Sequence, residues 1–109
     1  PLGVKVLPHF TSEHESSGHL YITEIPNITY KQRGEIIMKM AERDIACNVH
    51  YKPLPMHTAY KELGFDIKNY PNAYNHFAHE ITLPLHTCLT DEQVQYVIDN
   101  FVDILREYL

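Results

Sequence analysis

Val49-His50-Tyr51-Lys52-Pro53-Leu54-Pro55-Met56-His57 lies between two segments that both carry ordinary globular patterns. Its two prolines fix φ and remove two backbone donors, so residues 52–56 cannot lie inside a helix or a central strand. We expect a stiff, extended loop that holds the neighbouring side chains in place. Polar and aromatic groups on a rigid loop are commonly involved in binding or catalysis. The alternative interpretation is a proline-braced turn at the surface.

The composition indicates a single globular domain over residues 1–109, with residues 1–18 as a connecting segment. Hydrophobic residues make up 44% of the 109 residues, a share typical of a domain with one core. The formal net charge is −5 and no cluster of Lys or Arg occurs. Neither nucleic acid nor an anionic membrane is therefore an expected partner. No apolar run approaches the ~20 residues needed to cross a bilayer, and no signal peptide is visible.

Cys47 and Cys88 follow no metal-binding or redox spacing, and both have apolar neighbours. We interpret them as two buried free thiols in a cytoplasmic protein. The chain starts at Pro1 rather than at a methionine and runs directly into an apolar segment. This start indicates a portion of a longer polypeptide, so part of the functional site is expected to lie outside the chain.

The residues before the proline loop predict strands on both sides of a helix. Residues 4–10 predict a short strand that Pro8 ends, and residues 19–25 alternate in polarity as a half-buried strand does. Thr29 and Gln32 have the spacing of a capping box at a helix start, and residues 45–51 predict a short apolar strand. The core face of the helix is expected to hold Tyr30, Gly34, Ile37, Met38, Ala41 and Ile45. Methionines in such a pattern are usually core or near-core residues, here Met38 and Met40.

The residues after the loop predict short helices, an edge strand and a long final helix. Residues 58–63 predict helical turns that Gly64 ends, and residues 66–70 are read as connecting chain. Residues 81–85 predict an edge strand because of Pro84. Pro71 suits the first turn of a helix whose inward face is Ala73, Tyr74 and Phe77. Thr90 and Gln93 repeat the capping box before a stripe formed by Val94, Val97, Ile98, Phe101, Leu105 and Tyr108.

This order of elements predicts an α+β fold, a small sheet with helices packed on one face. The eight histidines raise the question of a metal site. The spacing of His9, His14 and His19 suits neither a helix face nor a strand face, and we expect no metal site there. His76, His79 and Glu80 form H-x-x-H-E, which differs from the helical zinc signatures and is interpreted as a solvated helix surface. No motif of a self-contained catalytic centre is visible, so no catalytic residue is assigned.

Five segments occur in an order that is informative as a set. They are Ser17-Gly18-His19-Leu20-Tyr21-Ile22, Arg33 within a helix, Val49-His50-Tyr51-Lys52-Pro53-Leu54, Tyr70-Pro71-Asn72-Ala73, and Leu83-Pro84-Leu85-His86-Thr87-Cys88-Leu89-Thr90-Asp91-Glu92-Gln93-Val94. From about Gly18 onward the chain closely resembles the C-terminal portion of the DegT/DnrJ/EryC1/StrS family of sugar aminotransferases, which depend on pyridoxal phosphate.

The resemblance implies the small C-terminal domain of an enzyme with the aspartate aminotransferase fold (fold type I). In that family a large N-terminal domain carries the lysine that holds the cofactor. The implied reaction transfers an amino group, usually from glutamate, to a keto group of a nucleotide-linked sugar, in surface polysaccharide or deoxyamino-sugar biosynthesis. The cofactor supplies the electron-sink chemistry, and the protein binds and orients the reactants. The implied partners are the keto-sugar, the amino donor and a second copy of the chain in a homodimer.

By the same resemblance, His50 and Tyr51 are substrate-binding residues, and His19 and Tyr21 support them from the nearby strand. No role is carried over to His57, because Leu54-Pro55-Met56 displaces it from the family's H-Y-x-P-x-H pattern. No cofactor-binding residue is assigned, because none of the lysines has a matching context. Two alternatives stay open at this point. One is a dehydratase of the same family that has lost the cofactor lysine, and the other is a binding module without catalytic activity.

Overall fold

A three-stranded antiparallel sheet forms the centre of the computed structural model, which describes residues 2–109. Its strands are β1 (Lys5–Val6), β2 (Tyr21–Glu24) and β3 (Glu80–Leu83), in the order β1-β2-β3. In the β2–β3 pairing, Tyr21 lies opposite Leu83 and Glu24 lies opposite Glu80. The predicted edge position of the third strand is confirmed, because β3 is last in the order.

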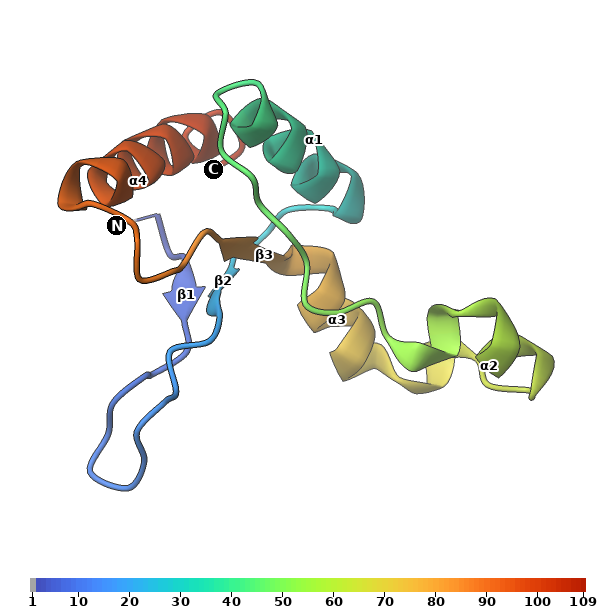
Figure 1. Cartoon of the computed structure of the whole chain (residues 1–109). Coiled ribbons are helices and arrows are strands. Elements are labelled where there is room, and N and C mark those ends of the chain that lie inside the picture. Colours follow the sequence, from blue (N-terminus) through green and yellow to red (C-terminus); the bar gives the residue numbers. More distant parts are fainter. Residues whose placement is uncertain (1) are drawn as a thin grey trace.

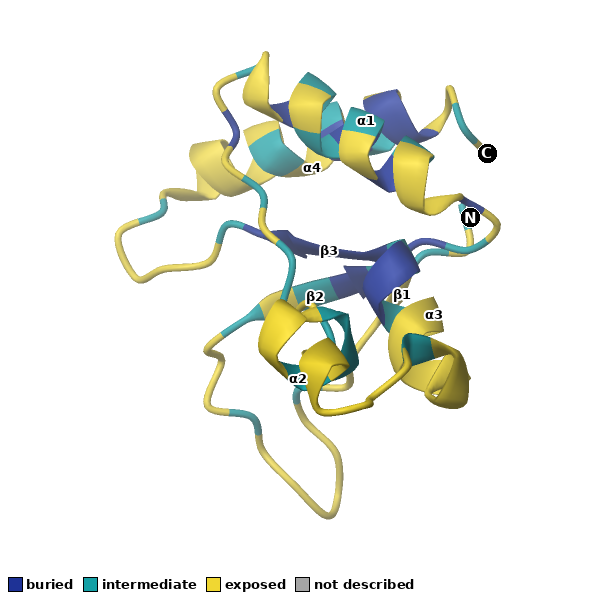
Figure 2. Ribbon diagram, turned by 90° about the vertical axis from the view of Figure 1, so that its right-hand side faces the viewer, coloured by how far each residue is buried: buried dark blue, intermediate teal, exposed yellow. Residues whose placement is uncertain are grey.

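Two long helices pack side by side on one face of this sheet (Figures 1 and 2). These are α1 (Tyr30–Ala41) and α4 (Asp91–Leu105). Both start at the capping boxes that the sequence predicts: Thr29 accepts from the Gln32 amide, and Thr90 accepts from the Gln93 amide, each at 3.2 Å. Such a reciprocal cap satisfies two backbone donors that the helix itself leaves free.

The core fills the space between the sheet and these two helices (Figure 2). Its fully buried members come from all the layers: Ile25, Ile36, Met40, Ile81, Ile104 and Leu105. The predicted α+β fold, a small sheet with helices packed on one face, is therefore confirmed. Phe101 is 5% exposed, as its position within the predicted stripe of the last helix requires.

The chain between α1 and β3 forms short helices that extend away from the sheet (Figure 1). They are η1 (Leu54–Met56), α2 (Thr58–Glu62), η2 (Ile67–Asn69) and α3 (Pro71–His79), which runs directly into β3. The end of α2 before Gly64, which has φ +88°, and the place of Pro71 in the first turn of α3 are both as predicted. A positive φ is accessible to glycine without the steric penalty of a side chain.

The strand predicted over residues 45–51 does not form. Only Asn48 pairs with β3, through two hydrogen bonds to Thr82 of 3.1 and 2.8 Å. The next two backbone amides donate to side chains instead: Val49 to Asn48 Oδ1 and His50 to Glu80 Oε2. Because these donors do not enter the ladder, the pairing ends after one residue. The strand predicted over residues 4–10 is shorter than expected and spans Lys5–Val6.

The buried face of α1 differs from the predicted one. Met40 is fully buried as expected, but Met38 is 62% exposed, and the other buried residues of α1 are Arg33 and Ile36. The Arg33 guanidinium lies 4.7 and 4.6 Å from the ring centroids of Tyr30 and Phe77, and it donates to the Phe77 carbonyl at 3.0 Å. Cation–π contacts of this kind allow an arginine to lie on a buried helix face, which hydrophobic periodicity does not anticipate.

Two further expectations about burial are wrong in part. On α4, Val94 and Ile98 of the predicted stripe are 41% and 45% exposed. On α3, Phe77 is buried, but Ala73 and Tyr74 of its predicted inward face are exposed.

The thiols of Cys47 and Cys88 are both free. Cys47 is partly buried, and burial raises its pKa to about 11, whereas Cys88 is exposed in the loop between β3 and α4.

Candidate functional site

A buried carboxylate lies on the face of β3 opposite the helices. Side chains alternate along a strand, and Ile81 and Leu83 face the core, so Glu80 and Thr82 face the other way. Glu80 is 0% exposed and Thr82 is 5% exposed. None of the ion pairs formed within residues 2–109 includes Glu80. Buried charges normally have partners that stabilise them, so the hydrogen bonds of Glu80 are informative.

His50 and Thr82 supply these hydrogen bonds. The His50 backbone N–H donates to Glu80 Oε2 at 2.9 Å, and the Thr82 hydroxyl donates to Glu80 Oε1. His50 Nδ1 lies 2.9 Å from Thr82 Oγ1. The backbone and the ring of His50 are thus both held by β3. We call His50, Thr82 and Glu80 the β3 polar cluster.

Tyr51 lies next to the β3 polar cluster and is open to solvent. Its ring contacts the His50 ring edge to face, with centroids 4.6 Å apart and planes at 85°. Tyr51 is 68% exposed, whereas His50 is partly buried. The imidazole is therefore anchored and the phenol is accessible, an arrangement that presents two hydrogen-bonding groups to a ligand at one place.

The proline loop after Tyr51 is braced, although it is not fully extended as expected. Residues 54–56 form one turn of 3₁₀ helix, because its hydrogen bonds use the amides of Met56 and His57, which the prolines do not remove. His57 Nε2 lies 3.3 Å from the Lys52 carbonyl and closes the loop on itself. The structure gives His57 this bracing contact.

Tyr21 lies apart from the β3 polar cluster, and no hydrogen bond within residues 2–109 joins His19 to it. His19 is exposed just before β2. Tyr21 lies opposite Leu83, on the sheet face that packs against α4, and its ring stacks on His9 with centroids 5.7 Å apart. The structure therefore brings His50 and Tyr51 together but places Tyr21 on the other face of the sheet. The substrate-binding roles of all four residues stay predictions.

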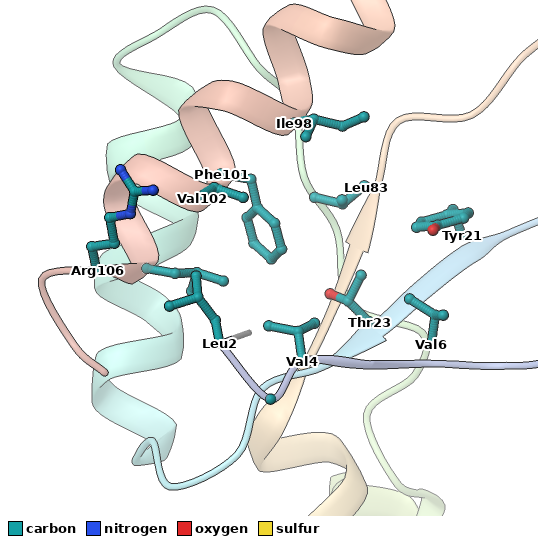
Figure 3. Close-up of a pocket in the computed structure, with 12 residues that line it drawn as sticks. Leu2, Val4, Val6, Tyr21, Thr23, Leu83, Ile98, Phe101, Val102 and Arg106 are labelled. Atoms are coloured by element: carbon teal, nitrogen blue, oxygen red, sulfur yellow. The ribbon is translucent and has the colours of Figure 1, made fainter.

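Tyr21 instead borders an apolar groove of about 610 Å³ between α4 and the N-terminal segment (Figure 3). Ile98 and Val102 of α4 and Arg106, which directly follows α4, form one wall, and Leu2 and Val4 lie opposite them. Within residues 2–109, Arg106 is the only side chain of the lining that carries a charge at neutral pH. The groove suits apolar contact and lacks the paired polar groups that acid–base chemistry requires.

The residues considered as metal ligands are dispersed. In the described part of the chain, no three side chains of His, Cys, Asp or Glu converge as a metal site requires. His76 Nδ1 lies 3.7 Å from Glu24 Oε2, while Glu80 is directed towards His50.

None of the helices described in residues 2–109 is long and apolar enough to cross a membrane.

The interpretation of Glu80 as part of a solvated helix surface is wrong, because Glu80 is 0% exposed and begins β3, and sequence reasoning gave Thr82 no role. Their signal was present, because two polar residues alternate with Ile81 and Leu83 in a strand that is buried on both faces. Polar side chains inside such a strand require partners. The partner, His50, is 30 residues away in the sequence, which is why the pattern alone did not connect them.

Comparison with known proteins decides the family. The model of the DegT/DnrJ/EryC1/StrS aminotransferase family matches residues 2–102. The chain belongs to this family. The fold agrees: a putative sugar aminotransferase of Streptococcus pneumoniae, solved in a form with pyridoxal phosphate, superposes with a TM-score of 0.94 at 52% identity over 97% of this chain. The small sheet with its helices thus resembles the C-terminal domain of fold type I aminotransferases.

Curated relatives in the family include sugar transaminases. A UDP-4-amino-4,6-dideoxy-N-acetyl-beta-L-altrosamine transaminase of Helicobacter pylori is 32% identical over 93% of this chain. The spore coat polysaccharide biosynthesis protein SpsC of Bacillus subtilis is 28% identical, also over 93% of this chain. The chain spans 28% and 27% of these two relatives, and 27% of the streptococcal structure. It therefore corresponds to about a quarter of the length of each of these proteins.

The lysines of this chain do not fit the cofactor of the family. A lysine that forms a covalent bond with pyridoxal phosphate is activated by a lowered pKa. Lys5 and Lys31 have side chains 75% and 87% exposed, and Lys52, Lys61 and Lys68 are exposed. The pKa of Lys39 is raised, mainly by its hydrogen bond to Glu107. None of the lysines in residues 2–109 is therefore suited to this bond.

Proposed function

We propose that this chain is the small C-terminal domain of an aminotransferase that acts on a nucleotide-linked keto-sugar. The reaction transfers an amino group, from glutamate, to the keto carbon, in the biosynthesis of surface polysaccharides or deoxyamino sugars. The observation that carries the proposal is the likeness to a putative sugar aminotransferase at 52% identity over 97% of the chain. The names of the curated sugar transaminase and polysaccharide relatives support the substrate class.

In this proposal the chain binds and orients the sugar, and pyridoxal phosphate is held by residues outside it. His50 and Tyr51 form hydrogen bonds with the sugar, and the β3 polar cluster and the braced proline loop keep them in position. A pre-positioned group loses little side-chain entropy on binding, which favours affinity and orientation. The enzyme is further proposed to be a cytoplasmic homodimer, like the homodimers that the family resemblance implies.

The direct test uses the full-length protein with a UDP-linked 4-keto sugar and glutamate whose amino nitrogen is isotopically labelled. We expect the label to appear in the sugar product, detected by mass spectrometry. A sugar that instead loses a hydroxyl group without gaining nitrogen would assign the protein to the dehydratases of the family. An unchanged sugar would favour the binding module. Either result would contradict the proposed transfer.

The 109-residue chain alone is expected to be inactive and to form no site-specific covalent adduct with pyridoxal phosphate. The physical reason is that no described lysine has the apolar surroundings that lower an amine pKa. The measurement is borohydride reduction in the presence of the cofactor, followed by peptide mapping. Sparse labelling spread over several exposed lysines is the expected result. One stoichiometrically labelled lysine would contradict it.

A further inference from the structure

We propose that buried Glu80, acting through Thr82, holds the His50 ring as the tautomer protonated at Nδ1, so that Nε2 offers a lone pair to the ligand. Glu80 is then a positioning residue, and His50 is specific for a ligand group that donates a hydrogen bond. The tautomer follows from the geometry of this chain. The identification of the ligand group as a sugar hydroxyl rests on the proposed function.

The first step concerns the charge of Glu80. Both of its oxygens accept hydrogen bonds, one from the His50 backbone amide at 2.9 Å and one from the Thr82 hydroxyl. An amide can only donate, so Oε2 must act as an acceptor. Hydrogen bonds donated to a carboxylate stabilise its ionised form. This pair of donors provides the compensation that a fully buried carboxylate requires.

The second step concerns the Thr82 hydroxyl, which has one proton to donate. Because this proton is directed to Glu80, Oγ1 can only accept from its other neighbour, His50 Nδ1, at 2.9 Å. Nδ1 must therefore carry a proton. In a neutral imidazole the other nitrogen, Nε2, is then an acceptor. The direction of the hydrogen bonds thus runs from His50 through Thr82 to Glu80.

The third step concerns access to Nε2. Within residues 2–109, no hydrogen bond engages it. The buried side-chain polar atoms without a partner in that range are His9 Nε2 and Arg33 Nε, so the Nε2 atom of the half-buried His50 is not fully buried. An acceptor at this position pairs with a hydroxyl, which donates. It does not pair with an ionised phosphate oxygen, which only accepts. The site therefore favours the sugar portion of the ligand over its phosphates.

Nuclear magnetic resonance of the full-length protein with ring-labelled histidine tests the tautomer without substrate. We expect a pyrrole-type signal for His50 Nδ1 and a pyridine-type signal for Nε2, with His50 assigned from its loss in His50→Gln. In Glu80→Gln the amide can donate to Thr82, which frees the hydroxyl to donate to Nδ1, so the two signal types should exchange. Thr82→Val should abolish the preference, and Thr82→Ser, which keeps the hydroxyl, should retain it.

Thr23→Val is the matched control. It removes another buried threonine hydroxyl from the sheet, one that donates to the Ile81 carbonyl at 2.6 Å on the opposite face. We expect it to leave the His50 signals unchanged, which separates positioning from general loss of stability. A pyridine-type Nδ1 in the unaltered protein would overturn the proposal. So would unchanged His50 signals in both Glu80→Gln and Thr82→Val.

Titration of the protein with ligand, followed by the His50 signals, distinguishes a sugar hydroxyl from a phosphate oxygen as the group that contacts Nε2. A UDP-linked hexose should shift the Nε2 signal while it remains of the acceptor type, and UDP alone should not. An equal shift with UDP alone would overturn the hydroxyl assignment. Because the tautomer is measured without substrate, a protein that showed the expected tautomer but failed to transfer nitrogen would support the role of Glu80 and contradict the proposed function.

Discussion

Phe101→Ala is expected to lower the free energy of unfolding by ~3–5 kcal/mol. The Phe101 ring is 5% exposed and belongs to the same buried cluster as Leu83 and Leu105. Figure 3 shows the ring between α4 and the sheet. The variant loses the free energy gained by burying the ring away from water. It also incurs the cost of the cavity that the missing ring leaves. Urea denaturation followed by circular dichroism measures the change.

Ile98→Ala is the matched control for Phe101→Ala. Ile98 lies on the same helix and borders the same groove, but it is 45% exposed. Its truncation should lower the free energy of unfolding by less than about 1 kcal/mol. Equal destabilisation by the two variants would show that α4 is not anchored to the sheet through Phe101.

Helix starts could be predicted from the sequence because their causes are local. Each capping box joins residues three apart, Thr29 with Gln32 and Thr90 with Gln93, and both form as predicted. The turn at Gly64 is equally local. The buried face of α1 could not be predicted in this way, because the burial of Arg33 depends on the Phe77 carbonyl and ring, 44 residues away.

In the candidate site too, some features could be predicted from the sequence, and others depend on residues that are distant in the sequence. The family resemblance points to His50 and Tyr51, and the structure places the two rings in contact. The residue that anchors them, Glu80, required knowledge of a pairing across 30 residues. Tyr21 illustrates the converse: the face on which it lies is fixed by the register of β2 against β3, and a shift of one residue would reverse it.

His50→Asn in the full-length protein is expected to raise KM for the keto-sugar about 10-fold and to leave kcat largely unchanged. Asparagine is shorter than histidine and removes the accessible ring nitrogen. The loss of one hydrogen bond to the ligand corresponds to about 1–1.5 kcal/mol. An interaction made equally in the bound substrate and in the transition state affects KM rather than kcat. His86→Asn, in the exposed loop before α4, is the control and should leave both constants unchanged.

The central claim is that this domain binds the sugar and leaves the cofactor chemistry to the rest of the protein. The two half-reactions test it most directly when they are measured separately in His50→Asn. We expect the half-reaction with glutamate to keep its rate, because it involves no sugar, and the half-reaction with the keto-sugar to require about 10-fold more substrate. An equal fall in the rate of both half-reactions would place His50 at the cofactor and contradict the account.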